Sequence, residues 1–236
     1  MELNLNQKFH NIINEIDITK KPNLFLHVCC APCSCGVFYQ LIKFFNIYII
    51  FYNSNIDSYL EYNLRLYELK SFLQKLSYNY SIIYSDYDHF EFLDYVKDLE
   101  HEMEGGIRCT KCFELRLKKS FEIANNYIKK NNLVSYTNYM CTTLSVSPHK
   151  DAKLINEIGE KICNNGFIRY LSSDFKKEDG YLNSIKLSKE LGLYRQNYWG
   201  CEFGKWIKWL ISAYSYFTNI YIYNKIYISE IIWLNM

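Results

Sequence analysis

Residues 24–36 of the chain read LFLHVCCAPCSCG. The run at 24–28 is short and apolar, as expected for a buried strand, and four cysteines follow within seven positions, at 29, 30, 33 and 35. A second pair, Cys109 and Cys112, lies far downstream. A strand that delivers so many thiols into one turn indicates a chemical site at its end, and the second pair is a candidate partner for that site.

Strand-like and helix-like segments alternate along the chain on either side of this stretch. Further strands are expected at 47–52, 79–84, 134–141 and 167–170, and helices at 1–22, 36–46, 58–76, 89–103, 109–130, 150–163 and 181–191. This alternation predicts an α/β fold, Rossmann-like, with a mostly parallel sheet flanked by helices. Ligands in such sheets bind beyond the carboxyl ends of the strands, where we expect the thiol turn.

Length and composition suit one globular domain, or one domain with a small appendage. Of the 236 residues, 49% are hydrophobic and 22% are charged, so the chain can bury a sizeable core. We expect residues 1–204 to form an α/β domain and the aromatic-rich residues 205–236 to form a C-terminal extension packed on it. The uncharged run 209–224 is shorter than the ~20 apolar residues of a spanning helix, so no membrane span is expected.

Charge and cysteine use narrow the class of protein. A net charge of +2 is too small to indicate nucleic-acid binding by itself. Residues 1–23 carry no apolar leader, which predicts a cytoplasmic location where thiols stay reduced. Nine cysteines in such a protein favour metal or redox chemistry over a disulfide framework. Of these, Cys35, Cys141 and Cys163 are expected to be small buried core residues.

The two C-x2-C pairs, Cys30 with Cys33 and Cys109 with Cys112, supply the four thiolates of a zinc site or an iron–sulfur cluster. Their wide separation favours a site at the sheet edge over a small zinc ribbon. Cys29 and Cys201 are additional thiols, suited to a second metal or a redox relay. Because adjacent residues of an extended chain point to opposite sides, we expect Cys29 and Cys30 to serve different centres.

Two common motifs are missing. The radical-SAM spacing C-x3-C-x2-C fails because position 36 is glycine, and no phosphate-binding G-x4-G-K-[ST] loop is found. ATP chemistry is therefore not expected.

Several polar residues are candidates for a functional role, and a structural explanation exists for them as well. Asn53 and Arg65 suit a crevice wall, or a helix cap and a surface ion pair. The segment with Thr142, Thr143, His149 and Lys150 suits anion binding at a helix start, or capping. Further candidates are Tyr194 and Arg195 for stacking on a nucleobase, and Arg108 and Arg116 for lowering thiol pKa values or holding phosphate. His27 is expected to be a satisfied core histidine.

Taken together, the motifs resemble the cobalamin-independent epoxyqueuosine reductases. Those that carry the resemblance are HVCCAPCS at 27–34, FYNSNI with EYNLR between 51 and 65, RCTKCFELRL at 108–117, TTLSVSPHK at 142–150 and YRQNYWGC at 194–201. The resemblance covers about residues 23–204 in consistent order. It implies an enzyme that reduces epoxyqueuosine in tRNA, at the anticodon arm, to queuosine, the last step of that modification.

The resemblance also implies cofactors and site residues. It implies a [4Fe–4S] cluster bound by Cys109, Cys112, Cys30 and one of Cys29 or Cys33, with room for an additional iron. Cys201 would lie beside the cluster as a metal ligand or redox thiol, and Cys29 and Cys201 would be catalytic. The family commonly ends its last motif with C-G-C, but position 199 here is Trp, so a disulfide at that motif lacks its second thiol.

The sequence leaves open the proton donor, the electron donor and the choice among competing functions. The substrate-binding residues implied are Asn53, Arg65, Thr142, Thr143, His149, Lys150, Tyr194 and Arg195. The proton donor is one of His27, Tyr198 or Arg195, and the electron donor is an unidentified partner. The competing functions are a cluster-dependent tRNA thiolase and a zinc-stabilised binding module without catalytic activity.

Overall fold

Five parallel strands form the centre of the first part of the chain in the computed structural model, which describes residues 4–76, 80–164 and 166–204. The strands are β1 (Asn23–His27), β2 (Asn46–Phe51), β3 (Ser81–Tyr84), β4 (Asn138–Thr142) and β5 (Ile168–Tyr170), in the order β3-β2-β1-β4-β5. All four strand pairs are parallel, which confirms the α/β prediction. The strand order reverses between β1 and β4, so the crevice expected for ligands lies beyond His27 and Thr142, which are partners in register.

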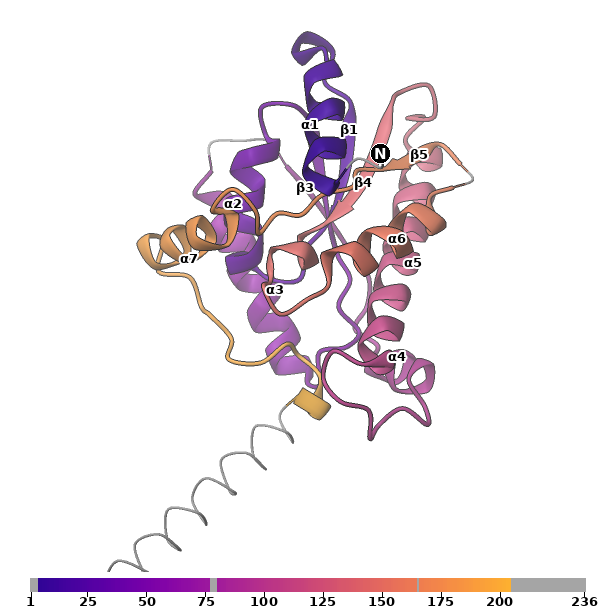
Figure 1. Ribbon diagram of the computed structural model, residues 1–236, viewed down its shortest axis with the longest axis vertical. Helices are drawn as coiled ribbons and strands as arrows, with labels where there is room; N and C mark the ends of the chain where they lie inside the picture. The colour runs from indigo at the N-terminus through magenta and orange to yellow at the C-terminus, as the bar shows by residue number, and fades with distance from the viewer. Residues whose placement is uncertain (1–3, 77–79, 165, 205–236) are drawn as a thin grey trace, which may run out of the picture. The chain divides into compact units, whose positions relative to one another are not determined.

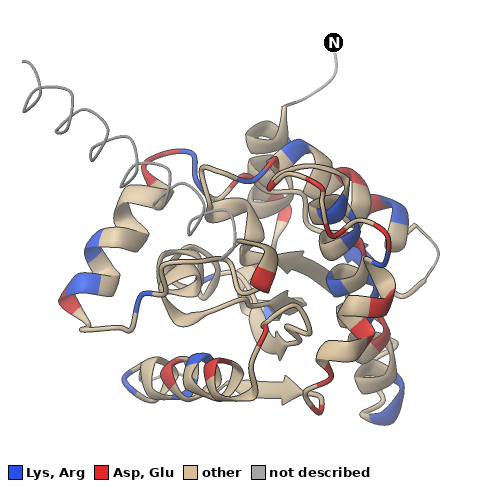
Figure 2. Cartoon of the chain, turned by 90° about the horizontal axis from the view of Figure 1, so that it is seen from below, with Lys and Arg blue, Asp and Glu red and all other residues tan. Residues whose placement is uncertain are grey.

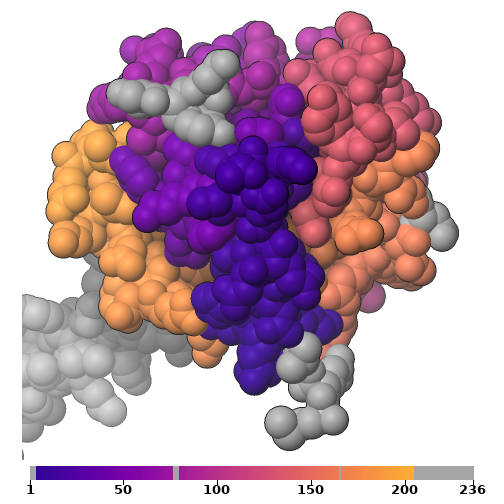
Figure 3. All heavy atoms as spheres, turned by 90° about the horizontal axis from the view of Figure 1, so that it is seen from above, coloured from indigo at the N-terminus to yellow at the C-terminus, as the bar shows by residue number. Residues whose placement is uncertain are grey.

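Helices cover both faces of this sheet (Figure 1). α2 (Ala31–Leu41), α3 (Tyr59–Gln74) and α7 (Gly180–Glu190) lie together on one face, and α5 (Ile107–Lys130) and α6 (Ala152–Ile162) lie on the other. The remaining helices are α1 (Leu5–Glu15) and α4 (His89–Tyr95), and short 3-10 turns span Ile18–Lys20 and Thr143–Val146. In Figure 3, the indigo residues of α1 lie at the surface beside the orange segment that follows β5, where Phe9 meets Phe175 edge-to-face.

Burial of β1 on both faces explains its unbroken apolar sequence. Leu24 and Leu26 pack into the core cluster shared with α2 and α3. The alternate residue Phe25 faces α5, where its ring centroid lies 6.0 Å from that of Tyr127. All five residues of β1 are buried, as expected for the central strand of a parallel sheet with helices on both faces.

Several element boundaries differ from the predictions. The helix expected over 1–22 ends at Glu15, because Ile16 is extended, and a 3-10 turn at Ile18–Lys20 follows it. α2 begins at Ala31 rather than 36, because Pro32 fits the first helical turn and Cys30 is the N-cap. β4 begins at Asn138 rather than 134, since a turn precedes it. α4 ends at Tyr95 rather than 103, and Asp98 beyond it has a φ of 67°, which an α-helix cannot continue.

The chain divides into two compact units, residues 1–197 and 198–236. The predicted domain boundary at 204 stays a prediction, and the extension 205–236 lies outside the described residues. Over the described ranges, no helix combines the length and the apolar character needed to cross a membrane.

Asn156 offers a test of how the segment after β5 is held. Its buried side chain donates to the carbonyls of Ala152 and Ser173, at 2.6 and 2.9 Å, and accepts from the Ser173 amide at 2.8 Å. Asn156→Leu leaves the Ser173 groups without these partners, so we expect the free energy of unfolding to fall by about 2–4 kcal/mol. Urea unfolding measures this loss.

The matched control is Glu157→Leu, because Glu157 is the next residue of α6 and its side chain is 58% exposed. We expect its effect to stay within about 0.5 kcal/mol. Equal losses of unfolding free energy in the two variants would show that the hydrogen bonds of Asn156 do not hold the segment after β5.

Candidate metal centre

Three thiols converge where β1 turns into α2. The Sγ atoms of Cys29, Cys30 and Cys33 all lie within 4.8 Å of one another, and those of Cys29 and Cys30 are 3.7 Å apart. Cys30 is the extended N-cap residue of α2, with φ −171° and ψ 163°, and Cys33 lies in the first turn. The expectation that Cys29 and Cys30 point to opposite sides is therefore wrong, because the chain bends at Cys29 instead of running extended through it.

Ionisation of the three thiols is unequal. Hydrogen bonds from the Cys30 and Cys33 thiols hold the pKa of Cys29 well below its usual value. The same hydrogen bond to Cys29 raises the pKa of Cys30 to about 12, and hydrogen bonds to Cys29 and Cys30 raise that of Cys33. The group thus holds its first negative charge on Cys29, and a cation is needed to ionise the others.

The second pair of thiols lies on the first turns of α5. Cys109 is buried and its Sγ accepts a hydrogen bond from the Gly105 amide at 3.2 Å. Burial raises the pKa of the Cys112 thiol, and the charge of Arg116, one turn later, partly offsets this effect. Cys109 and Cys112 are not part of the 4.8 Å group. This wider spacing is consistent with an iron–sulfur cluster, because the ligands of a cluster lie farther apart than those of a single metal ion.

Arg116 links the two sets of thiols. Its charge lowers the pKa of Cys29 as well as that of Cys112, which places it near both. Its guanidinium donates to Asn53 Oδ1 at 2.5 Å, and the Asn53 amide donates to the carbonyl of Val28 at 3.0 Å. This chain of contacts attaches α5 to the residue that precedes Cys29.

Arg116 also indicates what the site is built to hold. Its side chain is 3% exposed, its Nε has no hydrogen-bond partner, and no carboxylate pairs with it within the described part of the chain. A buried guanidinium is stable only beside compensating negative charge. Thiolates that bind a metal supply such charge, so the residues present fit a thiolate-ligated metal centre.

His27 lies beneath this turn as a core residue, as expected. Burial, reinforced by the charge of Arg116, lowers its pKa to about 3, so the ring is neutral at physiological pH. Its Nε2 lies 3.2 Å from the carbonyl of Tyr52, which only accepts, so Nε2 carries the proton. Nδ1 then accepts from the Thr142 hydroxyl at 2.7 Å. Both ring nitrogens are used, and the histidine ties the ends of β1, β2 and β4 together.

The structure brings some predicted polar residues to the thiols. The Thr143 hydroxyl accepts from the Cys29 amide at 3.3 Å and lies 3.5 Å from its Sγ. Thr142 contacts His27, and Asn53 contacts Arg116. Lys150 is half-buried, and its charge lowers the pKa values of Cys29 and Cys112.

Others lie in contacts of their own. Arg65 is buried and pairs with Glu61 at 2.7 Å, and the Tyr194 hydroxyl donates to the same carboxylate at 3.1 Å. Arg195 is exposed and donates to the Ser188 hydroxyl, while His149 is exposed. Substrate binding by the eight polar residues named from the sequence stays a prediction.

The two remaining candidates are Arg108 and Cys201. The buried Arg108 donates to the carbonyls of Leu99, Glu100 and Glu102, so it holds the loop before α5. Cys201 belongs to the second unit, residues 198–236. Its position beside the cluster and its catalytic role stay predictions.

One residue of the site was missed by the sequence analysis. The side-chain amide of Gln196 donates to Cys30 Sγ at 2.9 Å across 166 positions of the chain. Its place inside the YRQNYWGC motif was a signal, but spacing alone does not reveal which residue of that segment reaches the thiols.

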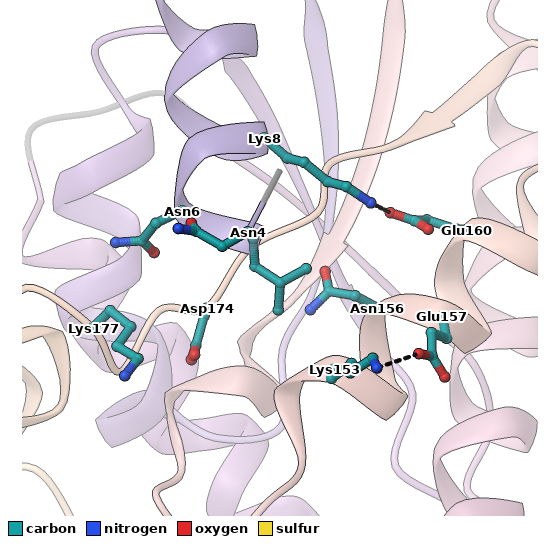
Figure 4. Close-up of a pocket in the computed structure, with 10 residues that line it drawn as sticks. Asn4, Asn6, Lys8, Lys153, Asn156, Glu157, Glu160, Asp174 and Lys177 are labelled. Carbon is teal, nitrogen blue, oxygen red and sulfur yellow. Dashed lines mark hydrogen bonds and ion pairs between the residues drawn. The ribbon is translucent and has the colours of Figure 1, made fainter. Parts of the chain in front are cut away.

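A separate cavity of about 590 Å³ lies between α1, α6 and the segment after β5 (Figure 4). Its charges are largely paired with each other, Lys8 with Glu160 at 3.3 Å and Lys153 with Glu157 at 3.8 Å. No cysteine is among the described residues that line it. In Figure 2, both signs of charge are spread over the helices, and no face of a single sign is visible. The thiol turn is therefore the candidate site.

Comparison with known proteins gives one consistent result. A family model described as "Epoxyqueuosine reductase QueH" matches residues 24–206. A protein of Streptococcus pyogenes serotype M1 with that name is 36% identical over 187 residues, 78% of this chain and 70% of that protein. The Staphylococcus epidermidis protein of the same name is 36% identical over 190 residues, 78% of this chain and 76% of its own length. The one from Thermotoga maritima is 32% identical over 185 residues, 76% of this chain and 88% of its own length. The resemblance noted in the motifs is confirmed, and the chain belongs to the epoxyqueuosine reductase QueH family.

Proposed function

We propose that this chain reduces epoxyqueuosine in tRNA to queuosine at a [4Fe–4S] cluster bound by Cys109, Cys112, Cys30 and one of Cys29 or Cys33. Membership of the family makes it an oxidoreductase of queuosine biosynthesis. The observation that carries the cluster assignment is the buried, carboxylate-free Arg116 among thiols from two distant elements. That arrangement fits a centre with more negative charge than one thiolate supplies.

Removal of the epoxide oxygen to leave an alkene consumes two electrons and two protons and releases water. A thiolate-bound iron–sulfur cluster supplies electrons one at a time, and an additional iron, where present, supplies a Lewis acid. We propose that Cys201 is a ligand of that iron.

The protein's own residues set the surroundings of this reaction. Arg116 and Lys150 place positive charge beside the thiols and favour binding of anionic groups there. His27 is neutral and fully bonded, so we assign it a positioning role and leave Tyr198 or Arg195 as the proton donor. The crevice between β1 and β4 is where we expect the modified base to enter.

The partners follow from the substrate. We propose that the anticodon arm of tRNA binds over the crevice between β1 and β4, where the strand order reverses. A separate electron-transfer protein delivers the two electrons. A tRNA substrate also supports a cytoplasmic location.

The direct test is anaerobic turnover. We expect the reconstituted chain, given dithionite and epoxyqueuosine-containing tRNA without ATP, to produce queuosine, measured by mass spectrometry of digested nucleosides. Iron and acid-labile sulfide analysis should give at least about four irons per chain.

The competing functions have distinct outcomes in the same experiment. A requirement for ATP with incorporation of sulfur into tRNA indicates a thiolase. A colourless, inactive protein with one zinc indicates the binding module, which the three thiols within 4.8 Å also suit.

A further inference from the structure

Gln196 reaches one of the converging thiols from the end of the first unit. Its Nε2 lies 2.9 Å from Cys30 Sγ, and this is a contact between side chains 166 positions apart. Among the hydrogen bonds found for the described residues, it is the one in which an amide side chain donates to a cysteine of the thiol turn. The contact was not predicted, and the reaction as derived above does not use it.

Hydrogen bonds to residues of α7 and α3 hold the segment that carries Gln196 in place. The amide of Leu193 donates to the carbonyl of Ser188 at 2.9 Å. The Tyr194 amide donates to Glu68 Oε2 at 3.1 Å, and the Arg195 guanidinium donates to the Ser188 hydroxyl at 3.0 Å. Gln196 is therefore presented to Cys30 by a segment whose backbone is already anchored, which lowers the entropy cost of the contact.

The amide presents its NH2 group to a sulfur that accepts. The proton of the Cys30 thiol is directed to Cys29, which leaves lone pairs of the Cys30 sulfur for Gln196. A metal-bound sulfur also offers lone pairs and no proton, so the same contact can persist when Cys30 is a ligand. The Gln196 Oε1 is buried and has no hydrogen-bond partner in the part of the chain that the structure describes.

We propose that Gln196 is a positioning residue of the metal centre, which donates an N–H···S hydrogen bond to Cys30 as a ligand and raises the reduction potential of that centre. The inference rests on the proposed function only for Cys30 being a metal ligand. A hydrogen bond to sulfur is stronger when the centre carries more negative charge, so it stabilises the reduced state more than the oxidised state. Gln196 thereby makes the centre easier to reduce by its electron donor.

The test compares two substitutions of Gln196 in the full-length reconstituted enzyme. Gln196→Met keeps the size of the side chain but removes the donor, and Gln196→Glu adds a negative charge that only accepts. We expect the ratio of reduced to oxidised centre at a fixed potential to fall about tenfold in Gln196→Met, or ~59 mV for a one-electron couple. The fall should be larger in Gln196→Glu. Redox titration followed by electron paramagnetic resonance measures both.

Gln74→Met is the matched control, because it makes the same chemical change at an exposed residue at the end of α3. We expect its potential to equal that of the wild type. An unchanged potential in Gln196→Met with the cluster intact overturns the inference, as does an equal fall in the control. A purely structural role would lower cluster content without moving the potential of the clusters that remain.

Failure of the inference and failure of the proposed function give different results. If the wild type holds a cluster but does not reduce epoxyqueuosine, the function fails, and the order of the three potentials still decides the role of Gln196. If the wild type holds no cluster, Co²⁺ is bound instead. Loss of the N–H···S bond should then move the sulfur-to-cobalt charge-transfer band to lower energy in Gln196→Met, and an unmoved band overturns the inference.

Discussion

Cys109→Ser is expected to abolish the reduction of epoxyqueuosine-containing tRNA. Cys109 is 8% exposed at the start of α5, and its sulfur already accepts a hydrogen bond from the Gly105 amide. A serine hydroxyl is a hard, weakly acidic ligand that replaces a soft thiolate poorly at an iron–sulfur cluster. Because loss of residues that only support a ligand already costs 10–100-fold in metal affinity or activity, we expect a loss of about 100-fold or more. Nucleoside mass spectrometry with iron analysis of the same samples measures it.

Cys163→Ser is the matched control for this result. Cys163 is also 8% exposed, but it is the C-cap residue of α6, and burial alone raises its pKa. We expect this variant to keep its iron content and most of its activity, with a modest loss of stability. Retained activity in Cys109→Ser would refute the cluster assignment, and equal loss in both variants would indicate general unfolding.

The fold was predictable from local pattern because burial on two faces leaves a strong mark on a strand. The run at 24–28 is apolar throughout, and the structure buries every residue of β1. Element ends were less predictable. The sequence placed residues 31–35 in the thiol turn, and only the N-cap geometry of Cys30 shows that α2 already begins at Ala31.

The site was predictable in its thiols and only partly in the contacts that organise them. Cysteine spacing is local, so Cys29, Cys30 and Cys33 stood out in the sequence. The contacts of Asn53 with Arg116 and of Gln196 with Cys30 join residues 63 and 166 positions apart, and no periodicity encodes them. Arg116 could be marked as a flank of the second pair, but its burial without a carboxylate partner could be seen only in the folded chain.

Arg116→Met should separate the metal-free protein from the metal-bound one. In the metal-free chain opposing effects act: the variant loses the hydrogen bond to Asn53 and the attraction to the Cys29 sulfur, but it no longer buries a guanidinium whose Nε has no partner. The lost contacts cost about 1–2 kcal/mol and the removal of the buried charge returns a similar amount, so we expect the stability of the metal-free chain to change by no more than about 1 kcal/mol.

In the metal-bound chain the charge of Arg116 has partners. Metal-bound thiolates surround it, and removal of one member of a buried charge pair costs about 3–5 kcal/mol. Arg116→Met should therefore reduce the stabilisation gained on metal binding, seen as a smaller rise in melting temperature between the two forms. Lys118→Met, at an exposed position of the same helix, should leave that rise unchanged. An equal loss of stability with and without metal would show that Arg116 serves only to hold Asn53, and the negative charge at this site would then need another explanation.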